Sequence, residues 1–369
     1  MIVFSEEQAM LLDTANEFCQ NQAPLSAVRE VIHNDAAMDP VVWQTMVDLG
    51  WLGISIPESF GGLGMNLADA VPIFEAMGRQ LMDTPLLAST VAAQVLIKDG
   101  SEEQKSTWLQ KISSGTIASV AYQETDGNWD LDAIEAVLTP TDAGGLILSG
   151  TKTLVPDAEV ADLFVVSALH EGRPVWCLVS RESLSASSLI ERETVIDETR
   201  RSYRVHFSDV LLSPKEVLPG CHFQHFELAS MMLIAAEMSG GLAGLLEVVV
   251  DYLNTRKQFD KLIGSYQALK HPTVDILLGS EMVRSYLYHA ATVWRENESV
   301  IAVESAIRMA KCCASEQFSE AGDRGIQFHG GFGFTYDCDA QLFLRRALWS
   351  QYQLGDERYQ RQKLGALLF

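Results

Sequence analysis

The sequence predicts an α+β multidomain protein: an N-terminal α-helical domain, a middle antiparallel β-barrel or sandwich, and a C-terminal four-helix bundle. Three observations predict this order. Apolar residues recur three and four apart up to about residue 115, short β-branched runs occupy residues 116–215, and long helical stretches occupy residues 216–369. A chain of 369 residues is long enough for two or three such domains.

The first domain, residues 1–115, is expected to be helical apart from one interruption. Ser5 and Gln8 have the spacing of a capping box, which predicts a helix start at Ser5. The segment Trp51–Gly64 contains Pro57 and several glycines and interrupts the helical pattern. Helices are expected to resume at residues 66–81, 86–98 and 102–113.

The middle domain, residues 116–215, contains six short runs rich in β-branched residues and punctuated by Gly, Asp and Pro. In one of them Tyr203, Val205 and Phe207 alternate with polar residues, as in a strand with one buried face. Six such runs in under a hundred residues predict a compact antiparallel barrel or sandwich.

The last domain, residues 216–369, is predicted to be a four-helix bundle. Helical stretches are expected near residues 223–258, 266–297, 299–322 and 337–365, with a glycine-rich break at Gly325–Gly333. Short connections between long helices are typical of bundles, because each helix buries its apolar face against its neighbours.

Composition excludes several classes of function. The chain has 27 Lys and Arg against 49 Asp and Glu, a formal net charge of −22, which argues against nucleic acid and anionic membranes as partners. No run of about 18 uncharged apolar residues and no basic leader followed by an apolar segment is present, so we expect no membrane span and a cytoplasmic protein. The six scattered cysteines predict neither a disulfide framework nor a zinc site.

Two glycine-rich stretches and one pair of cations are candidates for ligand binding. Ser239–Gly244 lies in an apolar helical run, where close helix packing explains its glycines. His329–Phe334 is either a helix–helix turn or a loop whose backbone N–H groups approach an anion. Arg256 and Lys257 either complement the negative end of a helix dipole, or Arg256 clamps a pyrophosphate. His222 and His225 have no third ligand nearby, so no metal site is predicted.

Taken together, the three domains and these motifs resemble the acyl-CoA dehydrogenase family from end to end. WLGISIPESFGGLG resembles the family's early G-x-x-[GS]-x-x-x-P-E-x-x-G-G segment. RKQFDKLIGSYQALKH resembles its RKQFGKPIGSFQAIQH segment, and GIQFHGGFGFTYDC resembles its Q-x-x-G-G-x-G-[FY] segment. Three matches in the right order and in the right domains are far more specific than any one of them.

The resemblance implies FAD-dependent α,β-dehydrogenation of an acyl-CoA thioester, with electrons passed to an electron-transfer flavoprotein. It also implies a homo-oligomer, or a heterotetramer with a homologous acyl-CoA dehydrogenase subunit, in which each FAD lies between two subunits. The positions that the family donates to its neighbour's FAD are matched by Arg256, Phe259, Gln267, Gln327, Gly330 and Gly331. Asp260 departs from the family's usual Gly.

The catalytic base is where the chain departs most. The family's chemistry needs a carboxylate that removes the α-proton, usually a Glu before a Gly near the C-terminus. Leu354 occupies that position, and leucine cannot accept a proton. The alternative position on the first bundle helix is Ser230. Two fallback bases remain: Asp356, which otherwise is a helix N-terminal carboxylate, and Glu227, which otherwise lies on a solvated face.

The middle domain departs as well. Where the family has TEPGAGSD lining the flavin, this chain has QETDGNWD (Gln123–Asp130). The family's W-I-T segment, whose Thr backs the flavin ring, appears as Leu154-Val155-Pro156. A proline at that place removes both the hydroxyl and the backbone donor.

Three hypotheses therefore stand. The chain is an acyl-CoA dehydrogenase in its own right, with Asp356 or Glu227 as its base. Alternatively, it is a non-catalytic subunit that completes a homologous partner's FAD site, as in bacterial steroid side-chain enzymes that this chain resembles. In the third, it keeps the fold but carries out thioester chemistry without removal of an α-proton. Met231, in place of a frequent Arg, favours a bulky apolar acyl group.

Overall fold

The computed structural model describes residues 6–33 and 38–369, so the helix start expected at Ser5 lies outside the described residues. Contacts between Cα atoms divide the chain into two compact units. The helical unit combines Met1–His33, Ala68–Asp83 and Met231–Phe369, and the sheet unit combines Asn34–Leu67 and Thr84–Ser230. Helices of the predicted N-terminal domain therefore belong to both units.

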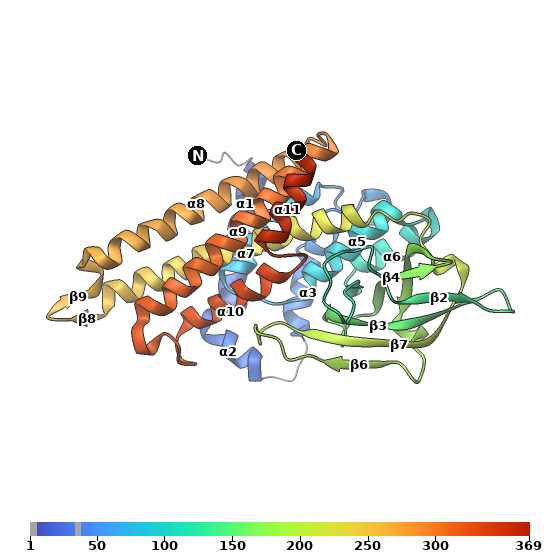
Figure 1. Cartoon of the computed structure of the whole chain (residues 1–369), viewed down its shortest axis with the longest axis horizontal. Coiled ribbons are helices and arrows are strands. Elements are labelled where there is room, and N and C mark those ends of the chain that lie inside the picture. The colour runs from blue at the N-terminus through green and yellow to red at the C-terminus, as the bar shows by residue number, and fades with distance from the viewer. Residues whose placement is uncertain (1–5, 34–37) are drawn as a thin grey trace. The chain divides into compact units, whose positions relative to one another are not determined.

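The helical unit is dominated by the C-terminal third of the chain. Its α-helices are α1 (Glu6–Gln22), α2 (Leu25–His33), α4 (Val71–Arg79), α7 (Phe223–Thr255, whose first turns belong to the sheet unit), α8 (Gln267–Arg295), α9 (Val300–His329), α10 (Asp339–Tyr352) and α11 (Glu357–Leu368). Helix α9 contacts α8, α10 and α11, and α8 and α9 lie side by side along the bundle (Figure 1).

Two boundaries in the bundle differ from expectation. The stretch expected at 337–365 is two helices, because Leu354 and Gly355 have φ of 57° and 99°, which an α-helix does not accommodate. Helix α9 continues through Gly325 to His329 instead of ending before the glycines. A Cβ at Gly325 would lie 3.0 Å from Leu245 Cδ1, so this glycine serves close packing within the helix.

The glycines of Ser239–Gly244 allow α4 and α7 to cross at close range, which confirms their interpretation as packing residues. A Cβ on Gly240 would lie 1.7 Å from Glu75 O, and one on Gly244 would lie 2.4 Å from Arg79 O. On α4, a Cβ on Gly78 would meet the backbone of α7 in the same way. The two backbones approach so closely that no side chain larger than hydrogen fits.

The sheet unit contains one seven-stranded sheet. Its strands are β1 (Ala118–Ala121), β2 (Val137–Pro140), β3 (Leu146–Pro156), β4 (Leu163–His170), β5 (Arg173–Ser180), β6 (Leu189–Arg192) and β7 (Ser202–Leu212). The order is β1-β4-β2-β3-β7-β6, with β5 paired to β4. Most pairs are antiparallel as expected, but β4 runs parallel to β1 and β2, so the sheet is mixed. Tyr203, Val205 and Phe207 are buried, which confirms the predicted alternation.

Three helices complete the sheet unit: α3 (Pro40–Asp48), α5 (Leu86–Asp99) and α6 (Glu102–Ser113). Helix α5 packs on β1, where Ser89 Oγ donates to Ala118 O and accepts from Ala118 N. Inside the sheet, the Lys152 ammonium pairs with the Glu124 carboxylate and donates to Ser167 Oγ. Burial lowers the pKa of Lys152 although Glu124 opposes that shift.

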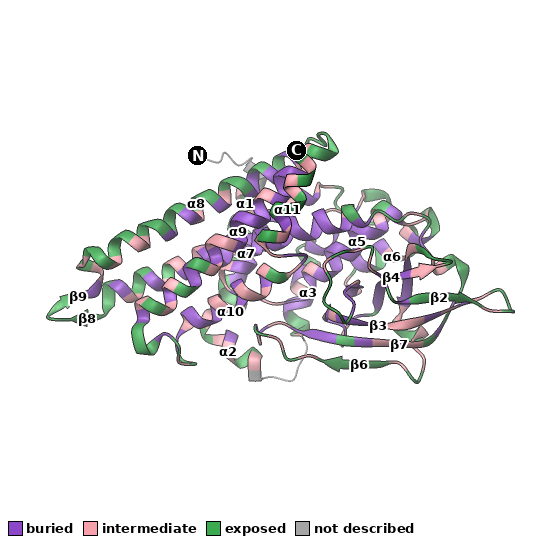
Figure 2. Ribbon diagram, in the orientation of Figure 1, coloured by how far each residue is buried: buried purple, intermediate pink, exposed green. Residues whose placement is uncertain are grey.

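Helix α7 is the one described helix long and apolar enough to cross a membrane, with a mean hydropathy of 1.7 over its most apolar window. Of that window, 72% is buried inside the protein, and Figure 2 shows the helix largely in the colour of buried residues. A helix that is apolar on all sides and covered by protein is the expected centre of a bundle.

Candidate functional site

Helix α9 ends in a glycine turn that leaves an open backbone surface. Gly330 ends the helix with φ of 59°, and the 3-10 turn η7 (Gly330–Phe332) leads towards α10. A Cβ on Gly330 or Gly331 would meet nothing within 4 Å. Of the two interpretations of His329–Phe334, the structure shows the helix–helix turn, between α9 and α10. Its open backbone is also compatible with the other interpretation, a ligand-binding loop.

A second turn follows the end of α7. The Arg256 N–H donates to Tyr252 O at 2.9 Å, and the Ile263 N–H donates to Arg256 O at 2.9 Å. Between them, β8 (Lys257–Gln258) and β9 (Lys261–Leu262) form a hairpin. Its turn residues Phe259 and Asp260 have φ of 54° and 61°, as a tight two-residue hairpin requires. The backbone of Arg256 is therefore held on both sides.

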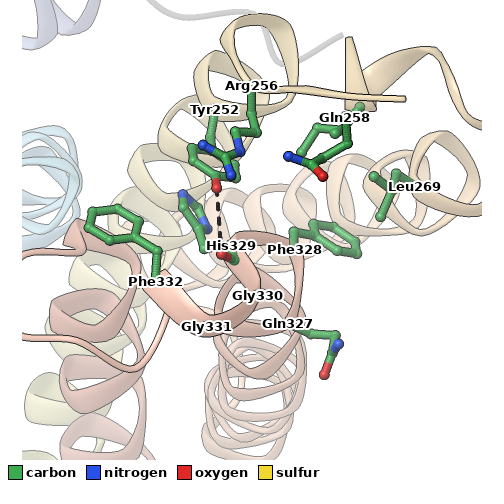
Figure 3. Close-up of a pocket in the computed structure, with 11 residues that line it drawn as sticks. Tyr252, Arg256, Gln258, Leu269, Gln327, Phe328, His329, Gly330, Gly331 and Phe332 are labelled. Carbon is green, nitrogen blue, oxygen red and sulfur yellow. Dashed lines mark hydrogen bonds between the residues drawn. The ribbon is translucent and has the colours of Figure 1, made fainter. Parts of the chain in front are cut away.

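The two turns border a pocket of about 750 Å³ (Figure 3). One wall is aromatic: the rings of Tyr252 and His329 stack with centroids 4.1 Å apart, and Phe332 lies 6.4 Å from Tyr252. The His329 ring is fixed by a hydrogen bond from Nδ1 to Gly325 O at 2.7 Å. The pocket is lined by Tyr252, Arg256, Gln258, Ile263, Leu269, Gln327, Phe328, His329, Gly330, Gly331 and Phe332.

The polar groups of the pocket suit an anion. The Arg256 side chain is exposed, and within residues 6–33 and 38–369 no carboxylate forms an ion pair with it. A guanidinium without a partner can bind two oxygens of a phosphate at once. Beside it, Gln258 adds an amide, whereas in Figure 3 the Gln327 amide points away from Arg256. The arrangement fits a ligand that carries both phosphate groups and a flat ring.

Four of the six residues predicted to contact the cofactor are brought together here: Arg256, Gln327, Gly330 and Gly331. Phe259, at the hairpin tip, is 87% exposed, and Gln267 is the exposed first residue of α8; neither lines the pocket. Sequence reasoning missed the aromatic wall. Two features of the sequence could have indicated this wall. Tyr252 lies one helical turn before Arg256, and His329 directly precedes the two glycines.

The loop between α10 and α11 holds Leu354, the position that the resemblance assigns to the base. Leu354 is 3% exposed. Lys311 Nζ on α9 donates to Gln351 O at 2.9 Å and to Gly355 O at 3.3 Å, while the Gln360 amide donates to Leu354 O. Burial lowers the pKa of Lys311 to about 8. A buried cation therefore ties down a loop whose central side chain is apolar.

The two fallback bases lie in different surroundings. Asp356 is the N-cap of α11, where its Oδ1 accepts from the Tyr359 N–H at 2.9 Å, as the helix-terminus interpretation predicts. Glu227 is 7% exposed, so its interpretation as a solvated-face residue is wrong. It lies near Tyr122, whose pKa is raised first by burial and then by the Glu227 charge. Ser230 donates its hydroxyl to Phe226 O at 2.7 Å.

The titratable side chains form no metal site in the part of the chain that the structure describes. Across the described ranges 6–33 and 38–369, no three His, Cys, Asp or Glu side chains are placed to hold a metal ion. His222 bonds through Nδ1 to the buried Asp99 carboxylate. Burial lowers the pKa of nearby His225 to about 4, so its imidazole is neutral at pH 7. The bond between His222 and Asp99 thus links the residue directly before α7 to the end of α5.

Family profiles match both ends of the chain. The profile described as "Acyl-CoA dehydrogenase, N-terminal domain" matches residues 5–116, and that of the "Acyl-CoA dehydrogenase, C-terminal domain" matches residues 229–368. The chain therefore belongs to the acyl-CoA dehydrogenase family, whose members are FAD-dependent oxidoreductases.

Individual relatives cover nearly the whole chain. Acyl-CoA dehydrogenase IpdE2 of Mycolicibacterium smegmatis is 27% identical over 99% of this chain and 100% of its own length. A solved steroid ACAD, Tcur3481-Tcur3483, has a TM-score of 0.88 at 26% identity and covers 98% of each chain. The ChsE4-ChsE5 complex from Mycobacterium tuberculosis has a TM-score of 0.89 at 23% identity, covering 99% of this chain and 98% of that one, a likeness of fold.

Proposed function

We propose that this chain is a subunit of an FAD-dependent acyl-CoA dehydrogenase and that it completes the FAD site of a homologous neighbouring subunit. One contrast carries the proposal. Four of the six residues that match those the family donates to a neighbour border an open pocket. The Arg256 guanidinium there has no ion-pair partner within residues 6–33 and 38–369, whereas the base position is the buried Leu354. In this proposal the chain keeps most of the cofactor contacts that it would donate to a neighbour, but it has no proton acceptor at the base position of its own site.

The pocket suits FAD by its chemistry. Arg256 would bind the pyrophosphate, and the bare backbone at Gly330 and Gly331 would allow it to approach. The stacked rings of Tyr252 and His329 offer a flat apolar surface for a planar part of the cofactor. When bound, FAD supplies the electron acceptor for α,β-dehydrogenation of the thioester.

The missing proton acceptor at position 354 supports the role of a partner subunit over that of an enzyme that works by itself. Dehydrogenation requires a positioned base within hydrogen-bond reach of the α-proton. The loop that holds Leu354 is tied to α9 by Lys311 and to α11 by Gln360, so its geometry is kept although its central side chain has no acidic group. In this proposal the base is supplied by the partner subunit.

The second candidate is a self-sufficient acyl-CoA dehydrogenase that uses Asp356 as its base. The position of Asp356 supports this candidate, because the residue is partly exposed and lies only two residues beyond Leu354. Its Oδ1 caps α11, and removal of an α-proton would be the task of its other oxygen. Glu227, buried beside Tyr122, is the less favoured base in this candidate.

For the substrate we propose an acyl-CoA with a bulky, steroid-derived acyl group, and for the electron acceptor an electron-transfer flavoprotein. The name of the steroid ACAD at 26% identity supports the substrate class. Met231, which stands where the family often has Arg, is fully buried, and this apolar side chain supports an apolar acyl group. We propose a cytoplasmic heterotetramer with a homologous subunit, and the homo-oligomer belongs to the second candidate.

The test removes the pocket's cation. The chain is co-expressed with a homologous acyl-CoA dehydrogenase chain, and the FAD released from the purified complex is counted by absorbance. We expect about one FAD per pair of chains, as in an assembly whose site is shared. Arg256→Gln should reduce the affinity for FAD about tenfold or more, because a charge-assisted bidentate contact is lost.

Lys257→Gln is the matched control, because it removes the same charge from the next residue, which does not line the pocket. It should leave the FAD content unchanged. The proposal fails if the chain purified alone is a homo-oligomer with one FAD per chain and dehydrogenase turnover. In that case Asp356→Asn, which would abolish turnover while FAD stays bound, tests the second candidate.

A further inference from the structure

The end of strand β3 carries Leu154-Val155-Pro156, the segment at the family's flavin-backing position. It departs from regular strand geometry. The pairing of β3 with β7 shifts register between Lys152 and Val155, and Leu154 has φ of 51°. The left-handed region is unfavourable for a leucine, so neighbouring contacts must hold the residue there.

Those contacts come from the carboxylate of Glu193, just beyond β6. Its Oε2 accepts the Leu154 N–H at 2.8 Å and its Oε1 accepts the Thr153 hydroxyl. Ser202 Oγ donates to Oε2 at 3.3 Å, and the Arg204 guanidinium lies 3.5 Å from Oε1. The Glu193 side chain is 15% exposed, so the carboxylate is held within the fold. This one group thus occupies the donors at Thr153 and Leu154, and Pro156 has no N–H to offer.

The loop Gln123–Asp130, at the other flavin-lining position, is closed on itself. Two backbone N–H groups of the loop and one just after it donate to side chains of the loop. Asn128 N–H donates to Asp126 Oδ1 at 3.0 Å, Asp130 N–H to Asn128 Oδ1 at 3.0 Å, and Asp132 N–H to Asp130 Oδ1 at 3.2 Å. Donors that a phosphate would need are engaged, and the loop adds exposed negative charges.

We propose that the sheet unit of this chain excludes flavin and that Glu193 is the residue that closes it, standing as an internal anion where the cofactor would lie. The inference rests on the proposed function, in which the chain serves the FAD site of a neighbouring subunit. The Glu193 carboxylate is 15% exposed and accepts hydrogen bonds from three donors, so a cofactor would have to displace it, and its charge also opposes the approach of an anionic cofactor.

The test uses the whole chain with the substitution Arg256→Gln, which weakens FAD binding in the pocket of the helical unit. FAD is titrated into the chain and binding is followed by quenching of flavin fluorescence. We expect Glu193→Ala to bind FAD at least about tenfold more tightly than the parent, because it frees Leu154 N–H and removes the charge. Glu191→Ala is the matched control: it removes an equal charge two residues earlier, from a side chain that is 58% exposed. It should bind no better than the parent.

Equal, weak binding by the parent and by Glu193→Ala would overturn the inference, as would tight FAD binding by the parent. Glu193→Gln, which keeps the shape of the side chain, replaces the alanine variant if near-UV circular dichroism shows that the latter has lost its native packing. These outcomes are separate from those of the proposed function, which concern FAD shared with a partner and lost on substitution of Arg256 alone.

Discussion

At the scale of single residues, buried charges in this protein hold backbone segments in place. Lys311 is fully buried, and its Nζ donates hydrogen bonds to three oxygens: Ser315 Oγ, Gln351 O and Gly355 O. Cys312, Glu357 and Asp356 act on it electrostatically and favour the charged form, but burial dominates and lowers its pKa to about 8. Its role is to join α9 to the loop around Leu354.

Lys311→Met tests this role through pH. The ordinary pKa of lysine, 10.5, exceeds the folded value of about 8, so between these limits the unfolded chain binds more protons. The free energy of unfolding of the parent should therefore rise with pH from 8 to 10.5 relative to the variant, by up to about 1.4 kcal/mol per pH unit. Urea unfolding at several pH values measures both curves, and parallel curves would contradict the assignment.

The same substitution also removes donors. At pH 7 we expect Lys311→Met to lower the free energy of unfolding by roughly 1–3 kcal/mol, because Gln351 O and Gly355 O lose their buried partner. Hydrogen exchange of the backbone between residues 351 and 356 should increase in the variant. Gly365→Ala is the control, because it changes the neighbouring helix α11 at a position where a Cβ meets nothing within 4 Å.

At the scale of elements, the crossing of α4 and α7 depends on the absence of side chains. Around it, Glu75 on α4 accepts hydrogen bonds from Ser239 on α7 and from Tyr288 on α8. The pKa of Tyr288 is raised by burial and by the Glu75 carboxylate. These polar contacts form only if the helices approach as closely as the glycines permit, so packing and hydrogen bonding depend on each other.

Gly240→Ala should lower the free energy of unfolding by about 1–3 kcal/mol, since its Cβ would fall 1.7 Å from Glu75 O and the helices must separate. Gly365→Ala is the matched control in a helix where a Cβ meets nothing within 4 Å. It should be neutral or stabilising by about 0.5–1 kcal/mol through helix propensity. Equal losses in the two variants, measured by chemical denaturation, would show that the α4–α7 contact is not tight.

At the scale of the whole molecule, a net charge of −22 surrounds an unusually apolar central helix. The charge keeps the surface hydrated and opposes unspecific association. The apolar length of α7 is used for packing, with 72% of its most apolar window buried. The molecule thus combines a strongly acidic surface with a helix that, by composition alone, resembles a membrane span.

We therefore expect the full-length chain to stay in the supernatant after ultracentrifugation without detergent, because burial of α7 leaves little apolar surface for a membrane. Replacing buried Ala235 on α7 by Asp should disrupt the packing and move the chain to the pellet. An exposed Val250→Asp change on the same helix is the control and should remain in the supernatant. Recovery of the unaltered chain with membranes would contradict the expectation.

Much of the fold could be predicted because periodicity reports which face of an element is buried. The alternation at Tyr203–Phe207 predicted β7, and the glycines of Ser239–Gly244 predicted close helix packing. The parallel pairing of β4 with β1 and β2 was not predictable, since both pairing directions need the same alternation of side chains. The break at Leu354 was missed because leucine seldom has positive φ.

For the candidate site, motif resemblance identified the residues but not their arrangement. Arg256, Gln327, Gly330 and Gly331 were named from the sequence, and they line one pocket. The aromatic wall of Tyr252 and His329 was not predicted, because stacking depends on how α7 and α9 lie relative to each other. Nor was Glu193, which lies 39 positions from Leu154 along the chain and meets it only across the sheet.

The sequence by itself determined the order of helical and β segments, the acidic character, the family resemblance and the absence of a carboxylate at position 354. These properties are local, so residue types and their spacing carry them. Only the tertiary structure decided that Arg256 lines an open pocket, with no acidic partner among residues 6–33 and 38–369, and that Glu193 binds Leu154 and Thr153. Both depend on contacts between segments far apart in the chain, which form only when the backbone folds and desolvates them.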